Sequence, residues 1–189
     1  GFRMPGEWEA QKSVWIAWPY NKNDWPGLYK FIPEVILEII NKISKHQKVN
    51  LIINSKIKSI KKILKSNKIK NISFHKIKTD RIWLRDSGPI FLTNKKYKKK
   101  IILNFVFSGW AKYKNYKNDN KINDKLSKII KLKKINPTIK KNGKLRKIIM
   151  EGGAFDVNGA GTILLTEECL LSKIQERNKK FNKKDYEGI

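Results

Sequence analysis

The chain has 189 residues, a length that allows one domain with a real core and gives no reason to expect two. Its formal net charge is +27, but 38 of its 43 basic residues are Lys and only five are Arg, spread through nearly every segment. Nucleic-acid binders typically use forked Arg side chains or basic patches interleaved with aromatics, so the charge favours a solvated surface and no nucleic-acid partner.

The cysteine content and the hydropathy exclude two further classes of protein. A single cysteine, Cys169, excludes an intramolecular disulfide framework, and no spacing resembles a zinc site, so neither a metal nor a cofactor is expected. No run approaches the roughly 18 apolar residues that a membrane span requires, and residues 1–20 lack a signal-peptide core. We expect a cytoplasmic protein without a membrane partner, and its oligomeric state stays open.

The first predicted elements alternate between strand and helix. Apolar residues recur at helical spacing from Ile32 to Ile43, and Pro33 is tolerated in the first turn. The predicted order is a strand at 14–18, a helix at 32–43, a strand at 49–53, a helix at 57–64 and a strand at 72–77. Because this is a β-α-β-α-β order, the sequence predicts an α/β fold in which helices pack on a sheet.

The second half predicts two hairpins around one helix. The first hairpin has strands at 90–93 and 101–107 joined by a lysine-rich turn at 95–100, and a helix follows at 123–132. The second has strands at 154–157 and 162–165 around a glycine-containing turn. Residues 178–189 are polar and indicate the beginning of a helix that ends without a capping signal and before it buries a face.

A first candidate site lies at the aromatic and charged segment that follows the third strand. Trp83, Arg85 and Asp86 precede a turn at Ser87–Pro89 that can bring Trp83 and Asp86 to one rim. A carboxylate accepts two parallel hydrogen bonds from a guanidinium, and an indole face attracts a cation by ~0.5 to 2 kcal/mol. The alternative is structural: Arg85 and Asp86 form local salt bridges while Trp83 fills the core.

A second candidate is the glutamate that precedes two glycines. Glu151 is followed by Gly152 and Gly153, which allow a close approach to the main chain that a side chain would block. The alternative is a turn with a solvent-facing glutamate. The two histidines, His46 and His75, fit structural positions at a helix end and within a strand better than catalytic ones.

Together these segments resemble the agmatine deiminase family, which is related to bacterial peptidyl-arginine deiminases and belongs to the pentein superfamily. The matching segments run in order along nearly the full length: 3–9, 15–19, 24–27, 83–89, 104–107, 151–156 and 165–171. The resemblance implies a pentein-type α/β propeller of ββαβ units, here incomplete. It also implies a hydrolase that converts agmatine and water to N-carbamoylputrescine and ammonia through a covalent amidino-cysteine intermediate, within polyamine metabolism.

The resemblance assigns roles to three residues of this chain. Asp86 would hold the guanidinium nitrogens, Trp83 would line the pocket beside them, and Glu151 would pair with the catalytic histidine. The family's His-x-Asp segment and its nucleophilic cysteine have no counterpart here, and Cys169 matches a position that is not the nucleophile. Residues 1–189 are therefore expected to be the N-terminal part of a single deiminase domain, inactive alone, whose C-terminal part with the histidine and cysteine is absent.

Two alternative functions stay open. The first is a peptidyl-arginine deiminase, but recognition of a C-terminal arginine needs a cation for its carboxylate, and no Arg appears between Asn104 and Phe107, which favours agmatine. The second is a non-catalytic basic module that binds a polyanion through its lysine surface. A salt titration against mixed-sequence duplex discriminates the latter, because such binding weakens steeply with salt.

Overall fold

A computed structural model describes residues 1–96 and 98–189, and the chain in it divides into two compact units. We call Ala10–Leu84 the first unit, and Gly1–Glu9 together with Arg85–Ile189 the second unit. No helix in the described part of the chain has both the length and the apolar character that crossing a bilayer requires.

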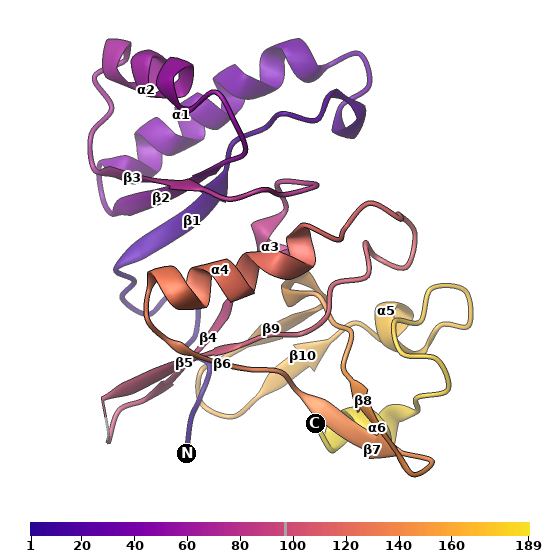
Figure 1. The fold of residues 1–189 in the computed structure, drawn as a ribbon. Helices are drawn as coiled ribbons and strands as arrows, with labels where there is room; N and C mark the ends of the chain where they lie inside the picture. The colour runs from indigo at the N-terminus through magenta and orange to yellow at the C-terminus, as the bar shows by residue number, and fades with distance from the viewer. Residues whose placement is uncertain (97) are drawn as a thin grey trace. The chain divides into compact units, whose positions relative to one another are not determined.

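The first unit is a parallel three-stranded sheet with two helices on one face, as Figure 1 shows. Strand β2 lies between β1 and β3, which confirms the predicted β-α-β-α-β order. Its elements are β1 (Ser13–Ala17), the 3-10 turns η1 (Lys22–Asp24) and η2 (Tyr29–Phe31), α1 (Ile32–Ser44), β2 (Lys48–Ile53), α2 (Ile57–Ser66) and β3 (Ile72–Lys76).

The core of the first unit forms where the apolar stripes of both helices meet alternate residues of β2. Val49, Leu51 and Ile53 point to the helix-covered face, where they pack with Ile40 of α1 and Leu64 of α2. Each of these side chains is almost fully buried, which stabilises the unit by about 1.5–3 kcal/mol per residue before entropy is counted. Because alternate strand residues face opposite sides, this core fixes the register of the sheet.

The second unit contains one complete ββαβ arrangement. Strands β4 and β5 pair antiparallel, and β6 returns parallel to β5 after α4, so the order in the sheet is β4-β5-β6. Ile122 and Leu126 of α4 are fully buried. The elements are α3 (Leu84–Ser87, which spans the boundary of the units), β4 (Ile90–Asn94), β5 (Lys99–Leu103), η3 (Asp119–Lys121), α4 (Ile122–Ile129) and β6 (Lys133–Ile135).

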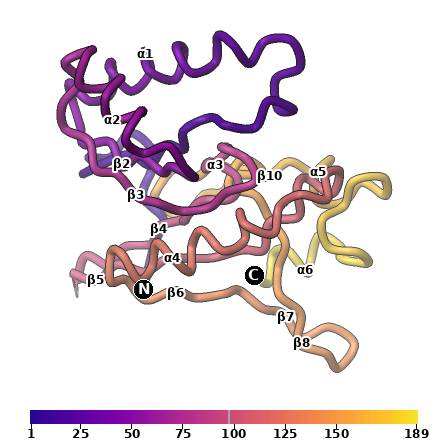
Figure 2. The backbone as a smooth tube through the Cα atoms, turned by 45° about the horizontal axis from the view of Figure 1, so that its top comes forward, coloured from indigo at the N-terminus to yellow at the C-terminus, as the bar shows by residue number. Residues whose placement is uncertain are grey.

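The rest of the second unit consists of two small hairpins and two short helices. The turn of the β7–β8 hairpin projects away from α4 in Figure 2. A core of Ile90, Met150, Phe155 and Leu170 joins the second hairpin to β4 and α5. The elements are β7 (Thr138–Lys141), β8 (Lys144–Lys147), η4 (Gly152–Ala154), β9 (Phe155–Val157), β10 (Ile163–Leu165), α5 (Glu167–Leu171) and α6 (Lys183–Glu187).

Both predicted hairpins are confirmed, as β4–β5 and β9–β10. The turn predicted at 95–100 includes Tyr97, which lies outside the described residues. The strand predicted to reach Phe107 ends at Leu103, because the chain then changes partners: Val106 forms a bridge with Ile149, and the N–H of Phe107 donates to Asn120.

The prediction for residues 178–189 is wrong in one respect. A helix is present, as predicted, and it begins with a capping box: the side chain of Asn182 accepts from the N–H of Asp185, and the side chain of Asp185 accepts from the N–H of Asn182. The wrong part is the expectation that the helix buries no face. Tyr186 packs at the edge of the core. The propeller implied by the resemblance stays a prediction beyond the single ββαβ arrangement described above.

Candidate functional site

The carboxylate of Asp86 is held by two N–H donors from distant parts of the second unit. The backbone N–H of Gly153 donates to Oδ1 at 3.0 Å, and the indole Nε1–H of Trp110 donates to Oδ2 at 3.1 Å. Burial raises the pKa of Asp86, and these two donors act against that shift. Each carboxylate oxygen keeps acceptor capacity, so the group is fixed in orientation and still able to accept from a ligand.

The two glycines after Glu151 are required by this geometry. A Cβ at Gly153 would lie 2.2 Å from Oδ1 of Asp86, and a Cβ at Gly152 would lie 2.3 Å from the carbonyl oxygen of Arg85. Neither position has room for a side chain, because the main chain itself lies against α3. This confirms the prediction that the glycines allow a partner to lie against the backbone; the partner is Asp86.

Trp110 was not predicted as part of the site. Gly109, Trp110 and Ala111 all have positive φ values, of 63°, 60° and 56°, a conformation that non-glycine residues rarely adopt. The indole is fixed by edge-to-face contacts with Phe107 and Tyr113, at centroid distances of 4.9 and 5.9 Å. This turn aims the Nε1–H at Asp86, and only a tryptophan directly after a glycine marks it in the sequence.

Glu151 is buried, and its side chain is 2% exposed. The guanidinium of Arg177 donates through Nε to Oε1 at 2.7 Å, and the Arg177 side chain is itself 4% exposed. Burial raises the pKa of Glu151, whereas the hydrogen bond and charge of Arg177 lower it. The alternative of a solvent-facing glutamate is therefore wrong. Arg177, like Trp110, was missed because it lies far from both motifs in the sequence.

The two predicted carboxylates act on each other. The charge of Asp86 raises the pKa of Glu151, and the charge of Arg177 lowers the pKa of both. The segment from Glu151 to Gly153 carries one carboxylate and donates a hydrogen bond to the other. The two acidic groups and Arg177 thus lie within range of one another's charge.

Arg85 does not form the local ion pair with Asp86 that the structural alternative expects. Its guanidinium pairs with Glu7 and, at 2.9 Å, with Asp156, and its Nε donates to the carbonyl of Gly152 at 3.1 Å. Arg85 contributes to the surroundings of Asp86 only through its charge, which lowers the pKa of that carboxyl. Its hydrogen bonds fix the glycine segment to the short helix instead.

Trp83 belongs to the first unit. Its ring lies 5.9 Å from that of Trp25, and the side chain is 41% exposed, so it does not fill the core as the structural alternative expects. Asp24, the neighbour of Trp25, forms an ion pair with Arg81 at 2.5 Å. The motif at residues 24–27 thus contacts Arg81 and Trp83. The predicted role of Trp83 beside Asp86 stays a prediction.

Neither His75 nor Cys169 belongs to this group of residues. His75 packs on Trp15 at 4.7 Å between ring centroids and lies 3.2 Å from Oδ1 of Asn50. Burial, and then the charge of Lys48, lowers the pKa of His75. Cys169 lies in α5 and packs against the apolar core of the second unit. Both side chains pack against neighbours within the chain, and their predicted non-catalytic role stays a prediction.

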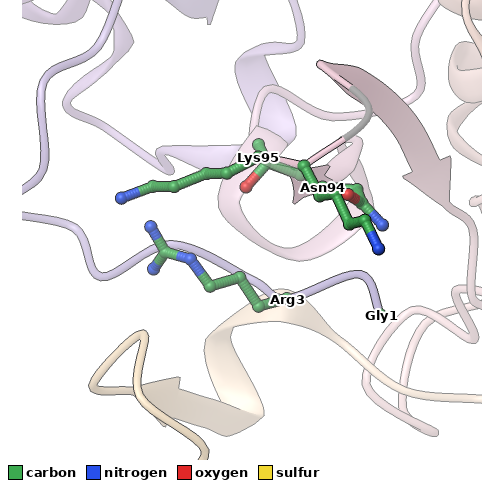
Figure 3. A pocket seen from close by; sticks show the side chains of 6 residues that line it. Gly1, Arg3, Asn94 and Lys95 are labelled. Atoms are coloured by element: carbon green, nitrogen blue, oxygen red, sulfur yellow. The ribbon is translucent and has the colours of Figure 1, made fainter.

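Two cavities lie elsewhere in the chain. One, of about 390 Å³, is bordered by Arg3, Asn94 and Lys95, whose side chains are shown in Figure 3. The guanidinium of Arg3 is already paired with Glu9 at 2.5 Å. The other cavity, of about 570 Å³, lies in the first unit near the end of β2. Neither is lined by the two carboxylates described above.

Comparison with known proteins establishes the class of protein. Residues 3–189 match the Porphyromonas-type peptidyl-arginine deiminase family, and the chain belongs to this family. A protein of Streptococcus mutans serotype c named "Putative agmatine deiminase" is 30% identical over 194 residues, which cover 99% of this chain and 49% of that protein. The chain spans about half the length of the curated relatives it matches.

Solved structures give the same result. An agmatine deiminase of Enterococcus faecalis has a TM-score of 0.82 at 27% identity, with 100% of this chain and 49% of that chain covered. A Cys-to-Ser variant of the C. jejuni agmatine deiminase with substrate bound has a TM-score of 0.76 at 28% identity, with coverages of 100% and 52%. The α/β fold of this chain is that of these deiminases, which confirms the family resemblance found from the sequence.

Proposed function

We propose that this chain supplies the guanidinium-binding carboxylates of an agmatine deiminase, which converts agmatine and water to N-carbamoylputrescine and ammonia. The observation that carries the proposal is the fixed carboxylate of Asp86, held by Gly153 and Trp110 within the electrostatic reach of a buried Glu151. The comparisons support the proposal, because the relatives reported above are named as agmatine deiminases.

Three side chains have roles in this proposal. Asp86 accepts N–H bonds from the guanidinium, a planar donor whose fork matches a carboxylate. Trp83 lines the guanidinium pocket, as the family resemblance implies. Glu151 pairs with the general-acid histidine, which is consistent with a second oxygen, Oε2, that is buried and accepts no hydrogen bond within the described residues.

The proposed chemistry has two steps. A cysteine thiolate adds to the guanidinium carbon to form a C–S bond, and the C–N bond to the leaving nitrogen breaks as the histidine protonates it, which releases ammonia. Water then adds to the amidino carbon and loses its proton to the histidine, and the C–S bond breaks to return the thiolate. The product carries a ureido oxygen from water, and no oxidant or cofactor takes part.

The nucleophile of this reaction lies outside these 189 residues in our proposal. Cys169 is the only cysteine of the sequence, and it packs in the apolar core of the second unit. We therefore propose that the chain alone binds agmatine weakly, with a dissociation constant on the order of 1 mM, and releases no ammonia.

The test is an agmatine titration of the ¹⁵N-labelled chain followed by NMR. The backbone amide of Gly153 and the indole N–H of Trp110 both donate to Asp86, so both resonances report on a cation that binds this carboxylate. Putrescine is the ligand control, because it has the same amine chain without a guanidinium. Asp86→Asn is the test variant, and Asp124→Asn, which removes a half-exposed carboxylate on α4, is the matched protein control.

The expected result is a saturable shift of both resonances with agmatine in the parent chain and in Asp124→Asn, and its loss in Asp86→Asn. Equal shifts with putrescine would show that only charge is recognised and would overturn the proposal. An arginine peptide serves as the third ligand: tighter binding of the peptide than of agmatine would favour the peptidyl-arginine alternative.

A further inference from the structure

We propose that Arg177 is a positioning residue for Glu151: it holds Oε1 of that carboxylate, so that Oε2 stays turned toward the reacting groups. The inference rests on the proposed function, because a reacting group is what Oε2 would meet. Arg177 is 26 residues from Glu151 in the chain, and it lies outside the sequence motifs described above.

The contact between the two residues is buried and uses one point only. Nε of Arg177 donates to Oε1 at 2.7 Å, with 4% and 2% of the two side chains exposed. The Nη1 group donates instead to the carbonyl of Gln175. Arginine frequently binds a carboxylate through two parallel N–H bonds, one to each oxygen. In this pair Nη1 of Arg177 donates to the backbone, and a single hydrogen bond, from Nε, joins the guanidinium to the carboxylate.

The second oxygen of Glu151 is the unusual feature. Oε2 is fully buried and accepts no hydrogen bond from the described residues, which is costly for an ionised group. The charged groups that act on this carboxyl are Arg177 and Asp86. Arg177 therefore supplies a positive charge that favours the ionised form of Glu151 against the effect of burial, and it leaves Oε2 as an acceptor for a donor that is not part of these elements.

The segment that carries Arg177 is itself anchored to the strand region before Glu151. The side chain of Asn178 accepts from the N–H of Ile149 at 2.9 Å and donates to the carbonyl of the same residue at 2.7 Å. Asn178 thus fixes the backbone of Ile149, two positions before Glu151, and the adjacent Arg177 fixes the carboxylate of Glu151. Such double anchoring suits a group whose direction matters, and an ion pair alone does not require it.

The experiment compares three variants of the full 189-residue chain with the parent. Arg177→Lys keeps the cation without the Nε geometry, and Arg177→Gln removes the cation. The double variant Glu151→Gln/Arg177→Gln leaves no charge buried alone, so its folding is not opposed by an unpaired buried carboxylate. Arg3→Gln is the matched control, since it breaks the Arg3–Glu9 ion pair of the same unit and does not touch Glu151. Circular dichroism establishes folding.

The first readout is the protonation midpoint of Glu151, measured by ¹³C NMR of labelled glutamate side chains and assigned with Glu151→Gln. We expect this midpoint to move to higher pH in Arg177→Gln, to move less in Arg177→Lys, and to stay at the parent value in Arg3→Gln. Because the charge of Arg177 lowers the pKa of Glu151 in any role, Arg177→Lys is the discriminating variant. A Glu151 midpoint in Arg177→Lys equal to that of the parent chain would show that only the charge matters, and that result would overturn the inference. If Arg177→Gln does not fold, the midpoint of Glu151 is measured in Arg177→Lys alone.

The second readout is the affinity for agmatine at two pH values. We expect Arg177→Gln to bind about three- to tenfold more weakly near the Glu151 midpoint and to recover part of the loss at higher pH, where the carboxyl ionises again. The double variant should fold but not recover. If the parent chain fails to bind agmatine, the proposed function fails, and the midpoint measurement still decides whether Arg177 controls Glu151. Unchanged affinity in a folded Arg177→Gln variant would overturn the inference.

Discussion

Gly153 and Asp86 are fitted to each other: the amide N–H of one donates to Oδ1 of the other at 3.0 Å, and that oxygen occupies the space a Cβ would need. The absence of a side chain at Gly153 and the direction of the Asp86 carboxylate are therefore one structural feature. The same contact joins the two sequence motifs, which are 67 residues apart.

Gly153→Ala should displace the Asp86 carboxylate. The added Cβ would lie 2.2 Å from Oδ1, so either the main chain or the carboxylate must move, at a cost of about 1–3 kcal/mol in unfolding free energy. We expect agmatine affinity to fall about tenfold, measured by NMR titration. Gly188→Ala is the control, because its Cβ would meet nothing nearer than 3.5 Å. Equal affinity in both variants would contradict this account.

Trp110→Phe should weaken the hold on Asp86 while keeping the aromatic packing. The substitution removes the Nε1–H donor, a hydrogen bond to a charged group worth about 1.5–3 kcal/mol, and retains a ring against Phe107. We expect the pKa of Asp86 to rise further and agmatine affinity to fall. The measurement is a ¹³C titration of labelled aspartate. Phe107→Leu, which alters packing only, should leave that titration unchanged if Trp110 acts through its N–H.

Agmatine binding should weaken as pH is lowered, and the weakening should begin above the pH range of an ordinary carboxyl. Burial raises the pKa of both Asp86 and Glu151, so each takes up a proton at a higher pH than in an unfolded chain. A protonated carboxyl attracts the cation less than an ionised one does. The affinity for agmatine therefore reaches its full value only at a pH above the raised pKa values of these carboxyls. Calorimetry in two buffers of different ionisation enthalpy measures the linked proton release. Affinity that is independent of pH down to the usual aspartate range would disprove the ionised-acceptor account.

Cys169→Ser should leave agmatine binding unchanged. The thiol packs against the apolar core around Leu170, so we expect a loss of about 1–3 kcal/mol in unfolding free energy from the buried hydroxyl and nothing at the site. An ammonia assay of the parent chain with agmatine should give no turnover. Turnover that Cys169→Ser abolishes would identify this cysteine as a nucleophile and sink our assignment.

The β10 strand should make the isolated chain self-associate. Ile163, Leu164 and Leu165 are 50%, 71% and 40% exposed, so apolar side chains on both faces of a short strand meet solvent. Light scattering with size exclusion should show concentration-dependent association, and Leu164→Lys should reduce it. Ile174→Lys, which changes a 96% exposed residue outside any strand, is the control. A parent chain that stays monomeric and unfolds cooperatively would refute this expectation.

The fold could be predicted where a local pattern is strong. Helix α1 and strand β2 follow from apolar spacing, and both hairpins follow from turns between alternating runs. Local patterns do not show where a strand ends because its partner changes, as at Leu103, where the next backbone bonds go to other elements. The short helix α3 was also missed, since four residues give no periodicity to read.

The site was predicted in part for a similar reason. Asp86 and Glu151 stand next to glycines or aromatics that mark them in the sequence, and the structure brings both into one neighbourhood. Trp110 and Arg177 act through contacts across 24 and 26 residues, which no spacing rule encodes. Their residue types alone also favour other roles: a tryptophan in the core and an arginine on a basic surface.

The small helix α6 extends the support of Glu151 toward the last residue of the chain. The hydroxyl of Tyr186 accepts from the Asn178 amide at 3.0 Å and donates to the carbonyl of Leu170 at 3.2 Å. Tyr186 therefore helps to hold Asn178, which hydrogen-bonds the backbone of Ile149. Removal of residues 183–187, which form α6, would thus disturb a carboxylate that lies far away in the sequence.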